Sequence, residues 1–141
     1  MPKLPCLCAT LRRSARALTQ HYEDALRPFG LRGSQFTILQ ALEFAGEVSQ
    51  GQLGEILAMD STTLTRTLDV MVRHGWITKR FGKDRRERLL RLAKAGQLQL
   101  NRALPAWQKV QSRLRRRLGD ERWEQLMKLT NEVTATVTEE E

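Results

Sequence analysis

The spacing of apolar residues predicts a mainly helical chain. Near the amino terminus, an apolar stripe at three- and four-residue steps runs from about Cys8 to Leu26, as in an amphipathic helix. A second stripe follows Ser34, which we expect to cap its helix. Toward the carboxyl terminus, the same spacing predicts a long helix over residues 94–118, kinked at Pro105, and a last helix after the cap Asp120.

Two shorter helix patterns lie between these regions, separated by a break at Met59 and Asp60. Ser49 and Gln52 form a Ser-x-x-Gln capping box that opens a helix of about two turns, with Leu53, Ile56 and Leu57 on its apolar face. The next helix is capped by Asp60 or Ser61, and its expected buried positions are Leu64, Leu68, Met71 and Val72.

The other face of this second short helix is polar. It carries Thr62, Thr63, Thr65, Arg66, Asp69 and Arg73. A short helix followed, through a tight turn, by a helix with hydroxyls and arginine facing outward is typical of a helix-turn-helix. In that motif the second helix reads bases in the major groove.

A basic hairpin follows the helix pair. Gly75 ends the second helix, residues 76–81 alternate apolar and polar side chains as a half-buried strand does, and residues 88–92 supply the partner strand. Turn residues over 82–87 join them. The hairpin carries Lys79, Arg80, Lys83, Arg85, Arg86, Arg88 and Arg91 against Asp84 and Glu87. This excess of positive charge predicts a wing that lies beside phosphates.

Four runs of residues carry a resemblance to a known family. They are Asp60-Ser61-Thr62-Thr63-Leu64-Thr65-Arg66, then Arg73-His74-Gly75-Trp76-Ile77, then Asp84-Arg85-Arg86 before Leu90-Arg91-Leu92. In this order they resemble the MarR family of bacterial transcription regulators, and the similarity covers nearly the whole chain. The resemblance implies a winged helix-turn-helix in which Arg86 enters the minor groove and Asp84 orients the wing. Leu92-Ala93 stands where the family usually has Leu-Thr, which removes a helix cap and no DNA contact.

The polar helix face and the wing together give a set of candidate DNA-binding residues. They are Ser61, Thr62, Thr63, Thr65, Arg66, Arg73, Lys79, Lys83, Asp84, Arg85 and Arg86. Composition supports a polyanionic partner such as double-stranded DNA, because the 141 residues carry a formal net charge of +8 and the pI is near 10.3. A basic surface can also bind a membrane, but no apolar run approaches the roughly 20 residues of a membrane span.

The terminal helices predict a homodimer. They carry more apolar side chains than one subunit can bury, among them Trp107, Val110, Leu114, Trp123, Leu126, Met127, Val133 and Val137. A monomeric helical bundle is the alternative. We therefore expect one domain over 1–141, with dimerisation helices in 1–33 and 94–141 and the DNA-binding region in 34–93, as the resemblance also implies. Arg113 and Arg115 to Arg117 are expected to complement the helix dipole and pair with acids such as Glu124.

The chain contains two cysteines, both near the amino terminus. They make no disulfide framework, the amino terminus has no long apolar stretch typical of a secretory signal, and a reducing cytoplasm fits best. The first helix resembles that of the organic-hydroperoxide-sensing branch of the family. This resemblance places Cys8 at the peroxidatic position and Tyr22 at one of two thiolate-holding tyrosines, while Gly33 replaces the second. Cys6 is additional, so the pair could also bind a soft metal ion or form disulfides between subunits.

The signal has other candidates. The family resemblance also allows a small aromatic ligand in a crevice lined by Trp107, Phe36, Arg16 and His21. The two cysteines can equally be small apolar residues near an interface. No cofactor motif, no metal site and no catalytic residue is expected, because His21 and His74 lie outside any known catalytic motif.

Two function classes stay open. The first is a sequence-specific DNA-binding regulator, expected to be a repressor that leaves a palindromic operator on ligand binding or thiol modification. The second is an architectural or protein-interaction module that uses the winged helix without operator selection. A large preference for one palindrome over random DNA would distinguish the first class from the second.

Overall fold

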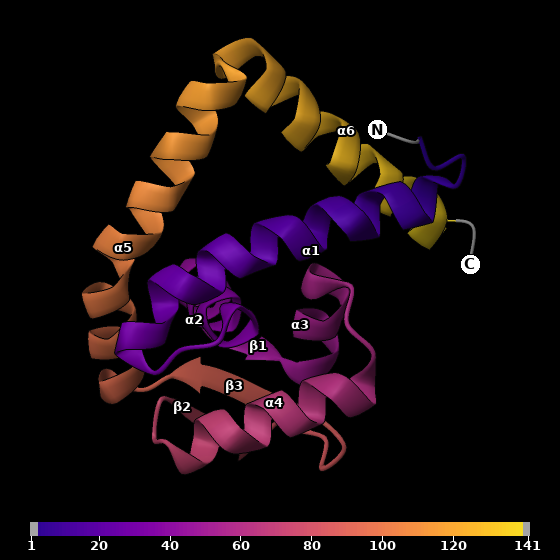
Figure 1. The fold of residues 1–141 in the computed structure, drawn as a ribbon. Helices are drawn as coiled ribbons and strands as arrows, with labels where there is room; N and C mark the ends of the chain where they lie inside the picture. Colours follow the sequence, from indigo (N-terminus) through magenta and orange to yellow (C-terminus); the bar gives the residue numbers. More distant parts are fainter. Residues whose placement is uncertain (1–2, 140–141) are drawn as a thin grey trace. The chain divides into compact units, whose positions relative to one another are not determined.

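The computed structural model describes residues 3–139, which form a mainly helical fold with one small antiparallel sheet (Figure 1). The elements in chain order are α1 (Leu7–Leu26), the 3-10 turn η1 (Arg27–Phe29), α2 (Gly33–Ala45), β1 (Val48–Ser49), α3 (Gln50–Leu57), α4 (Ser61–Arg73), β2 (Ile77–Phe81), β3 (Arg88–Leu92), α5 (Lys94–Leu118) and α6 (Asp120–Glu139). The predicted fold class of helices with a small hairpin is confirmed. None of the described helices is long and apolar enough to cross a bilayer.

The chain divides into two compact units, unit 1 (Met1–Trp107) and unit 2 (Gln108–Glu141). Unit 1 contains α1 to α4, the sheet and the first half of α5. Unit 2 contains the end of α5 and α6. The boundary thus falls inside α5. The borders of the DNA-binding region at 33 and 93 stay a prediction.

Local capping positions the two short helices of unit 1. The Ser49 hydroxyl accepts a hydrogen bond from the backbone N–H of Gln52 at 3.1 Å, and the Gln52 side chain accepts from the N–H of Ser49 at 2.9 Å. A left-handed residue, Ala58, ends α3. Asp60 then caps α4 by accepting from the N–H of Thr63 at 2.9 Å. The predicted capping box and the break between the helices are confirmed, and Asp60 is the cap.

The sheet holds three strands in the order β1-β3-β2. The hairpin register pairs Ile77 with Leu92 and Phe81 with Arg88. On the other side of β3, β1 contributes only two residues and pairs Val48 with Leu90. Strand β1 was not predicted, because two residues are too few to show the alternation of apolar and polar side chains that marks a strand.

The predicted buried positions of α4 are confirmed at Leu64, Leu68 and Met71, which belong to the core of unit 1. Val72 is different, with 37% of its surface exposed, because it lies about 100° further round the helix than Met71. The burial expected for Val72 was therefore wrong. On the apolar face of α3, Leu53 is buried, whereas Ile56 is 58% exposed.

Two predicted caps and one strand end were also wrong. Helix α2 begins at Gly33 instead of after Ser34, because the Gly33 N–H is already bonded to the carboxylate of Glu23 at 2.7 Å. Asp120 lies inside α6, where its carboxylate pairs with Arg115 at 2.8 Å instead of capping the helix. Trp76 precedes β2, where its ring stacks on that of His74 with centroids 4.3 Å apart.

Candidate nucleic-acid interface

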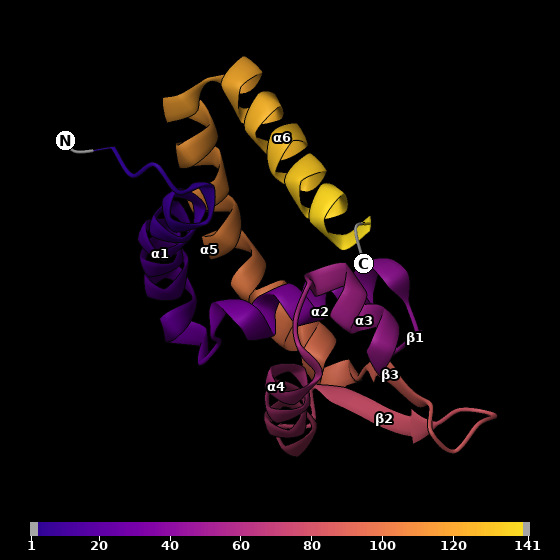
Figure 2. The same ribbon diagram turned by 90° about the vertical axis from the view of Figure 1, so that its right-hand side faces the viewer.

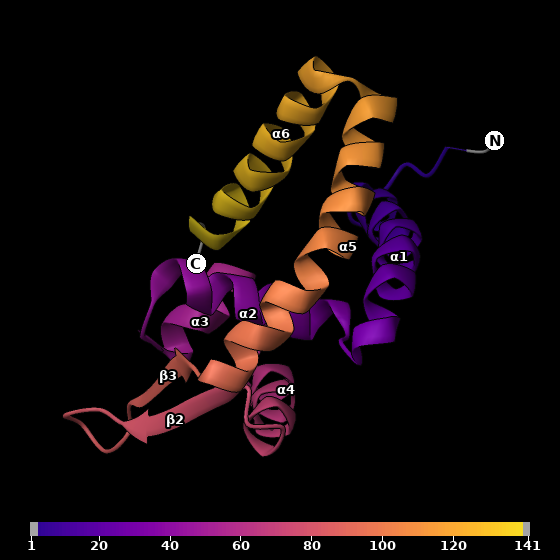
Figure 3. The same cartoon turned by 90° about the vertical axis from the view of Figure 1, so that its left-hand side faces the viewer.

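Helix α4 has one face in the core and one face outside it. Its buried side consists of Leu64, Leu68 and Met71. Exposed residues cover the other side, namely Ser61, Thr62, Thr63, Arg66, Asp69 and Arg73, while Thr65 is half-buried. The fold therefore positions the polar face that the sequence predicted, and the hairpin β2–β3 extends away from α4 (Figures 2 and 3).

The half-buried Thr65 differs from its neighbours on α4, because it is bonded to another helix. The side-chain amide of Gln50, the first residue of α3, donates a hydrogen bond to the Thr65 hydroxyl oxygen at 2.9 Å. Gln50 was not among the predicted site residues. No sequence signal marks it, since the contact joins residues that are 15 positions apart.

The wing tip, residues 82–87, is shaped by its own backbone contacts. The Asp84 carboxylate accepts a hydrogen bond from the N–H of Arg86 at 3.0 Å, which makes an Asx turn. The Asp84 carbonyl accepts from the N–H of Glu87, and Gly82 donates to the Glu87 carbonyl, both at 2.9 Å. Asp84 thus fixes the backbone from which the Arg86 side chain projects, in keeping with the orienting role that the family resemblance implies.

The basic residues of the hairpin strands are engaged within unit 1. Arg80 makes two hydrogen bonds to the Glu47 carboxylate, at 2.9 and 2.6 Å. These bonds lower the pKa of Glu47 below its usual value. Lys79 lies 3.9 Å from Asp69, and the Arg88 guanidinium stacks over the Phe81 ring at 4.1 Å. These contacts lie within unit 1, and the phosphate contacts expected for the hairpin stay a prediction.

Five other basic side chains of this region have no hydrogen bond or ion pair within the described residues. They are Arg66 and Arg73 on α4 and Lys83, Arg85 and Arg86 at the wing tip. All five are exposed. Unpaired guanidinium and ammonium groups beside a row of hydroxyls can bind phosphates and base edges.

The segment that follows α4 contacts the start of α5. Gly75 takes a positive φ of 76°, which ends the helix as predicted. The Trp76 carbonyl then accepts a hydrogen bond from the N–H of Ala93 at 2.9 Å. A Cβ on Gly96 would lie 2.0 Å from that same carbonyl oxygen, so only glycine allows α5 to pass this close.

The candidate sensing residues lie on α1 and do not meet within one chain. Cys6 and Cys8 are both exposed and free. Tyr22 is half-buried, and burial raises the pKa of its hydroxyl. Because α1 is one continuous helix, the 14 residues from Cys8 to Tyr22 span about 21 Å. The described residues contain no group of three His, Cys, Asp or Glu side chains that could hold a metal ion.

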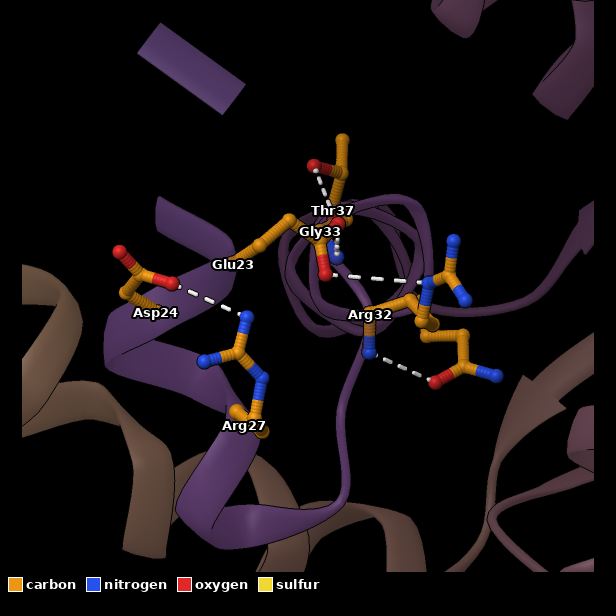
Figure 4. A network of polar contacts seen from close by, with 7 residues as sticks. Glu23, Asp24, Arg27, Arg32, Gly33 and Thr37 are labelled. Carbon is orange, nitrogen blue, oxygen red and sulfur yellow. Dashed lines mark hydrogen bonds and ion pairs between the residues drawn. The ribbon is translucent and has the colours of Figure 1, made fainter. Parts of the chain in front are cut away.

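A cavity of about 570 Å³ lies in unit 1 between α1, α2 and the first half of α5. Phe36 and Trp107 line it as predicted, with ring centroids 5.7 Å apart, whereas Arg16 and His21 do not. Part of the network in Figure 4 also lines it: Glu23 accepts from the N–H of Gly33 and lies 3.7 Å from the Arg32 guanidinium. Glu23, on α1, and Arg32, directly before α2, were not among the predicted lining residues.

Comparison with known proteins agrees with this geometry. Residues 29–87 match the MarR family. The chain is 33% identical to the M. tuberculosis transcriptional regulator MosR, solved in complex with DNA, with a TM-score of 0.85 over 94% of this chain and 96% of that one.

Two Bacillus subtilis (strain 168) proteins are also similar. The HTH-type transcriptional regulator YwoH is 34% identical over 84 residues, which cover 60% of this chain and 61% of YwoH, less than two thirds of its length. The organic hydroperoxide resistance transcriptional regulator is 33% identical over 99 residues, covering 70% and 67%. These relatives are regulators, and the expectation that the chain is not an enzyme is confirmed. The chain belongs to the MarR family of winged helix-turn-helix transcription regulators.

Proposed function

We propose that this protein is a homodimeric repressor that binds a palindromic DNA operator. The observation that supports this most is the set of five unpaired basic side chains on the exposed face of α4 and at the wing tip. Arg66 and the hydroxyls of α4 would contact base edges in the major groove, and Arg86 would enter the adjacent minor groove. The similarity to MosR, which was solved with DNA, supports the same geometry.

The proposed dimer rests on unit 2. None of its described residues is buried, although α6 carries a stripe of large apolar side chains. Leu126, Leu129 and Val137 are each at least 45% exposed. A second copy that covers this stripe removes the apolar surface from water, and its two-fold symmetry would place two α4 helices about 34 Å apart on a palindrome.

Two routes of release follow from unit 1. A small aromatic ligand in the cavity would pack on Phe36 and Trp107 and change how α1, α2 and α5 pack against one another. Alternatively, the exposed Cys8 thiolate would attack an organic hydroperoxide, giving a sulfenic acid and an alcohol. Tyr22 could approach this sulfur only from the partner subunit, since it lies too far along the same helix.

Serine substitutions at Cys8 and Cys6 test whether a thiol causes release and whether one sulfur is enough. Cys8→Ser should abolish release by mild organic hydroperoxide, and reductant should restore binding of the oxidised wild type. Cys6→Ser should leave release intact if one peroxidatic thiol suffices, whereas a disulfide or a soft metal ion needs both sulfurs. Equal sensitivity of the wild type and the double serine variant would leave the cavity as the signal site.

The repressor proposal is tested by selecting binding sites from a randomised duplex library. We expect an inverted repeat, bound at least about 1,000-fold more tightly than random duplex at physiological salt. Occupancy of a promoter that carries the repeat should lower transcription in vitro. Equal affinity for all duplexes would contradict operator recognition and indicate an architectural winged-helix protein instead.

A further inference from the structure

The contact between Gln50 and Thr65 joins the two helices of the helix-turn-helix through one hydrogen bond. Gln50 is the first residue of α3, directly after the capping residue Ser49, so its backbone is fixed. Its side-chain Nε2 donates to the Thr65 Oγ1 at 2.9 Å. The side chain of Thr65 is thereby held from the α3 side.

Among the described residues, the Thr65 hydroxyl makes no hydrogen bond to a carbonyl of its own helix, whereas most of the other helical threonines do. Thr19, Thr37 and Thr67 each donate their proton to the carbonyl four residues earlier, at 2.6, 3.0 and 3.1 Å. Thr65 has no such bond within the described part of the chain; its oxygen accepts from Gln50 instead. The amide therefore occupies the acceptor side of the hydroxyl and leaves the proton available to an outside acceptor.

We infer that Gln50 is a specificity-determining positioning residue, which holds Thr65 as a hydrogen-bond donor toward the DNA bases. This inference rests on the proposed function, in which α4 enters the major groove. Thr65 lies in the second turn of α4, beside the exposed Thr62 and Arg66, where recognition helices contact base edges. A donor at this place reads a base that presents an acceptor: guanine N7 or O6, adenine N7 or thymine O4.

One substitution can exchange the donor and acceptor roles of residues 50 and 65. In Gln50→Glu, the carboxylate can only accept, so it would take the Thr65 proton and leave Thr65 with lone pairs alone. Thr65 would then favour a base that presents a donor, cytosine N4 or adenine N6. An acidic residue in the first turn of α3 also complements the helix dipole, so the fold should be kept.

The experiment selects sites from a randomised duplex library with the wild type, Thr65→Val, Gln50→Ala and Gln50→Glu. Thr65→Val should reduce the preference at one base pair of each half-site about two- to tenfold, the size of one hydrogen bond. Gln50→Ala should weaken the same preference, and Gln50→Glu should change the preferred base there from acceptor to donor. Thr67→Val is the matched control, because its hydroxyl is bonded to the Thr63 carbonyl.

A double variant separates positioning from direct contact. In the Thr65→Val background, Gln50→Glu should no longer change the preferred base, although its negative charge lowers affinity for every duplex. The inference is overturned if Gln50→Glu changes the preference equally with and without Thr65, or if Thr65→Val selects the wild-type site unchanged. Selection of no site by the wild type would contradict the proposed function itself. Thermal melting of each variant establishes that it is folded.

Discussion

The two units of this chain use the same apolar spacing for different purposes. In unit 1 the apolar positions of α2, α4 and β3 are buried together, and every buried apolar residue of the described chain lies in this unit. In unit 2, α6 has an equally regular stripe, yet Leu126 and Val137 remain exposed. Unit 1 has a core of its own, whereas none of the described residues of unit 2 is buried.

This difference shows what an apolar period can and cannot specify. Period and caps determine that a helix forms and which of its faces is apolar. They do not determine whether that face meets the same chain or a second copy. The contrast can be tested first at the surface of unit 2 that we propose a partner covers, and last at the exposed ion pairs of each unit.

The largest effect is expected where the stripe of unit 2 is made charged. Leu126→Glu combined with Val133→Glu places two carboxylates in the proposed interface of each subunit. Losing this burial should weaken dimerisation by more than about 3 kcal/mol, over a hundredfold in Kd. Sedimentation should show a monomer at micromolar concentration, and binding to the selected palindrome should be lost.

The matched control puts the same two charges on the other side of α6. Asn131→Glu with Ala135→Glu should remain dimeric and bind the palindrome, because these positions lie about 140 to 180° away from the stripe. A monomer in the control as well, or a dimer in both variants, would refute the assignment of this face.

The next effect concerns the core of unit 1. In Gly96→Ala the new methyl group would meet the Trp76 carbonyl at 2.0 Å, and the contact atom is backbone, which cannot rotate away. We expect a loss of about 2–4 kcal/mol in the free energy of unfolding, as for overpacked sites. Denaturant melts would measure this. Gly51→Ala, whose Cβ would meet the Ser49 Oγ at an ordinary van der Waals distance of 3.9 Å, should instead stabilise slightly. Equal behaviour of the two variants would contradict the close approach of α5.

Sequence reasoning was most successful where a local rule decides the structure. The capping box at Ser49, the strand Arg88–Leu92 and the helix Lys94–Leu118 lie where the pattern predicts them. Several of the errors share a cause, a contact with a residue far along the chain. Glu23 bonds the N–H of Gly33 and so starts α2 earlier than predicted, and Gln50 and Arg80 find partners 15 and 33 residues away. The periodic pattern of apolar residues does not indicate which distant side chains form such pairs.

A smaller effect, on DNA binding, is expected for the side chains on the outer surface of unit 1, which we propose contact DNA and which lie outside the core. Arg86→Ala should weaken binding by about 1–3 kcal/mol on every duplex, because a minor-groove arginine responds to groove width and potential. Arg66→Ala should relax the base preference instead. Fluorescence anisotropy on the selected and random duplexes measures both, with unchanged melting temperatures as the control. Parallel losses of affinity and selectivity in the two variants would disprove this division between helix and wing.

The smallest effect is expected from the surface ion pairs. Each unit contains an arginine that makes two hydrogen bonds to carboxylates. Arg80 bonds Glu47 in unit 1, and Arg115 bonds Asp120 and Glu124 in unit 2. Both arginines are exposed, so solvent screens them and Glu47→Gln should shift the melting temperature only slightly. The pKa of Glu47 is lowered in the folded state, so its contribution is fully present above the unfolded pKa of about 4.3 and is lost as the pH falls through the lower pKa of the folded state. Melting the wild type and Glu47→Gln should show a larger difference at pH 7 than at pH 3. A larger difference at pH 3 would contradict the assignment, because it would mean that protonation of Glu47 stabilises the folded state.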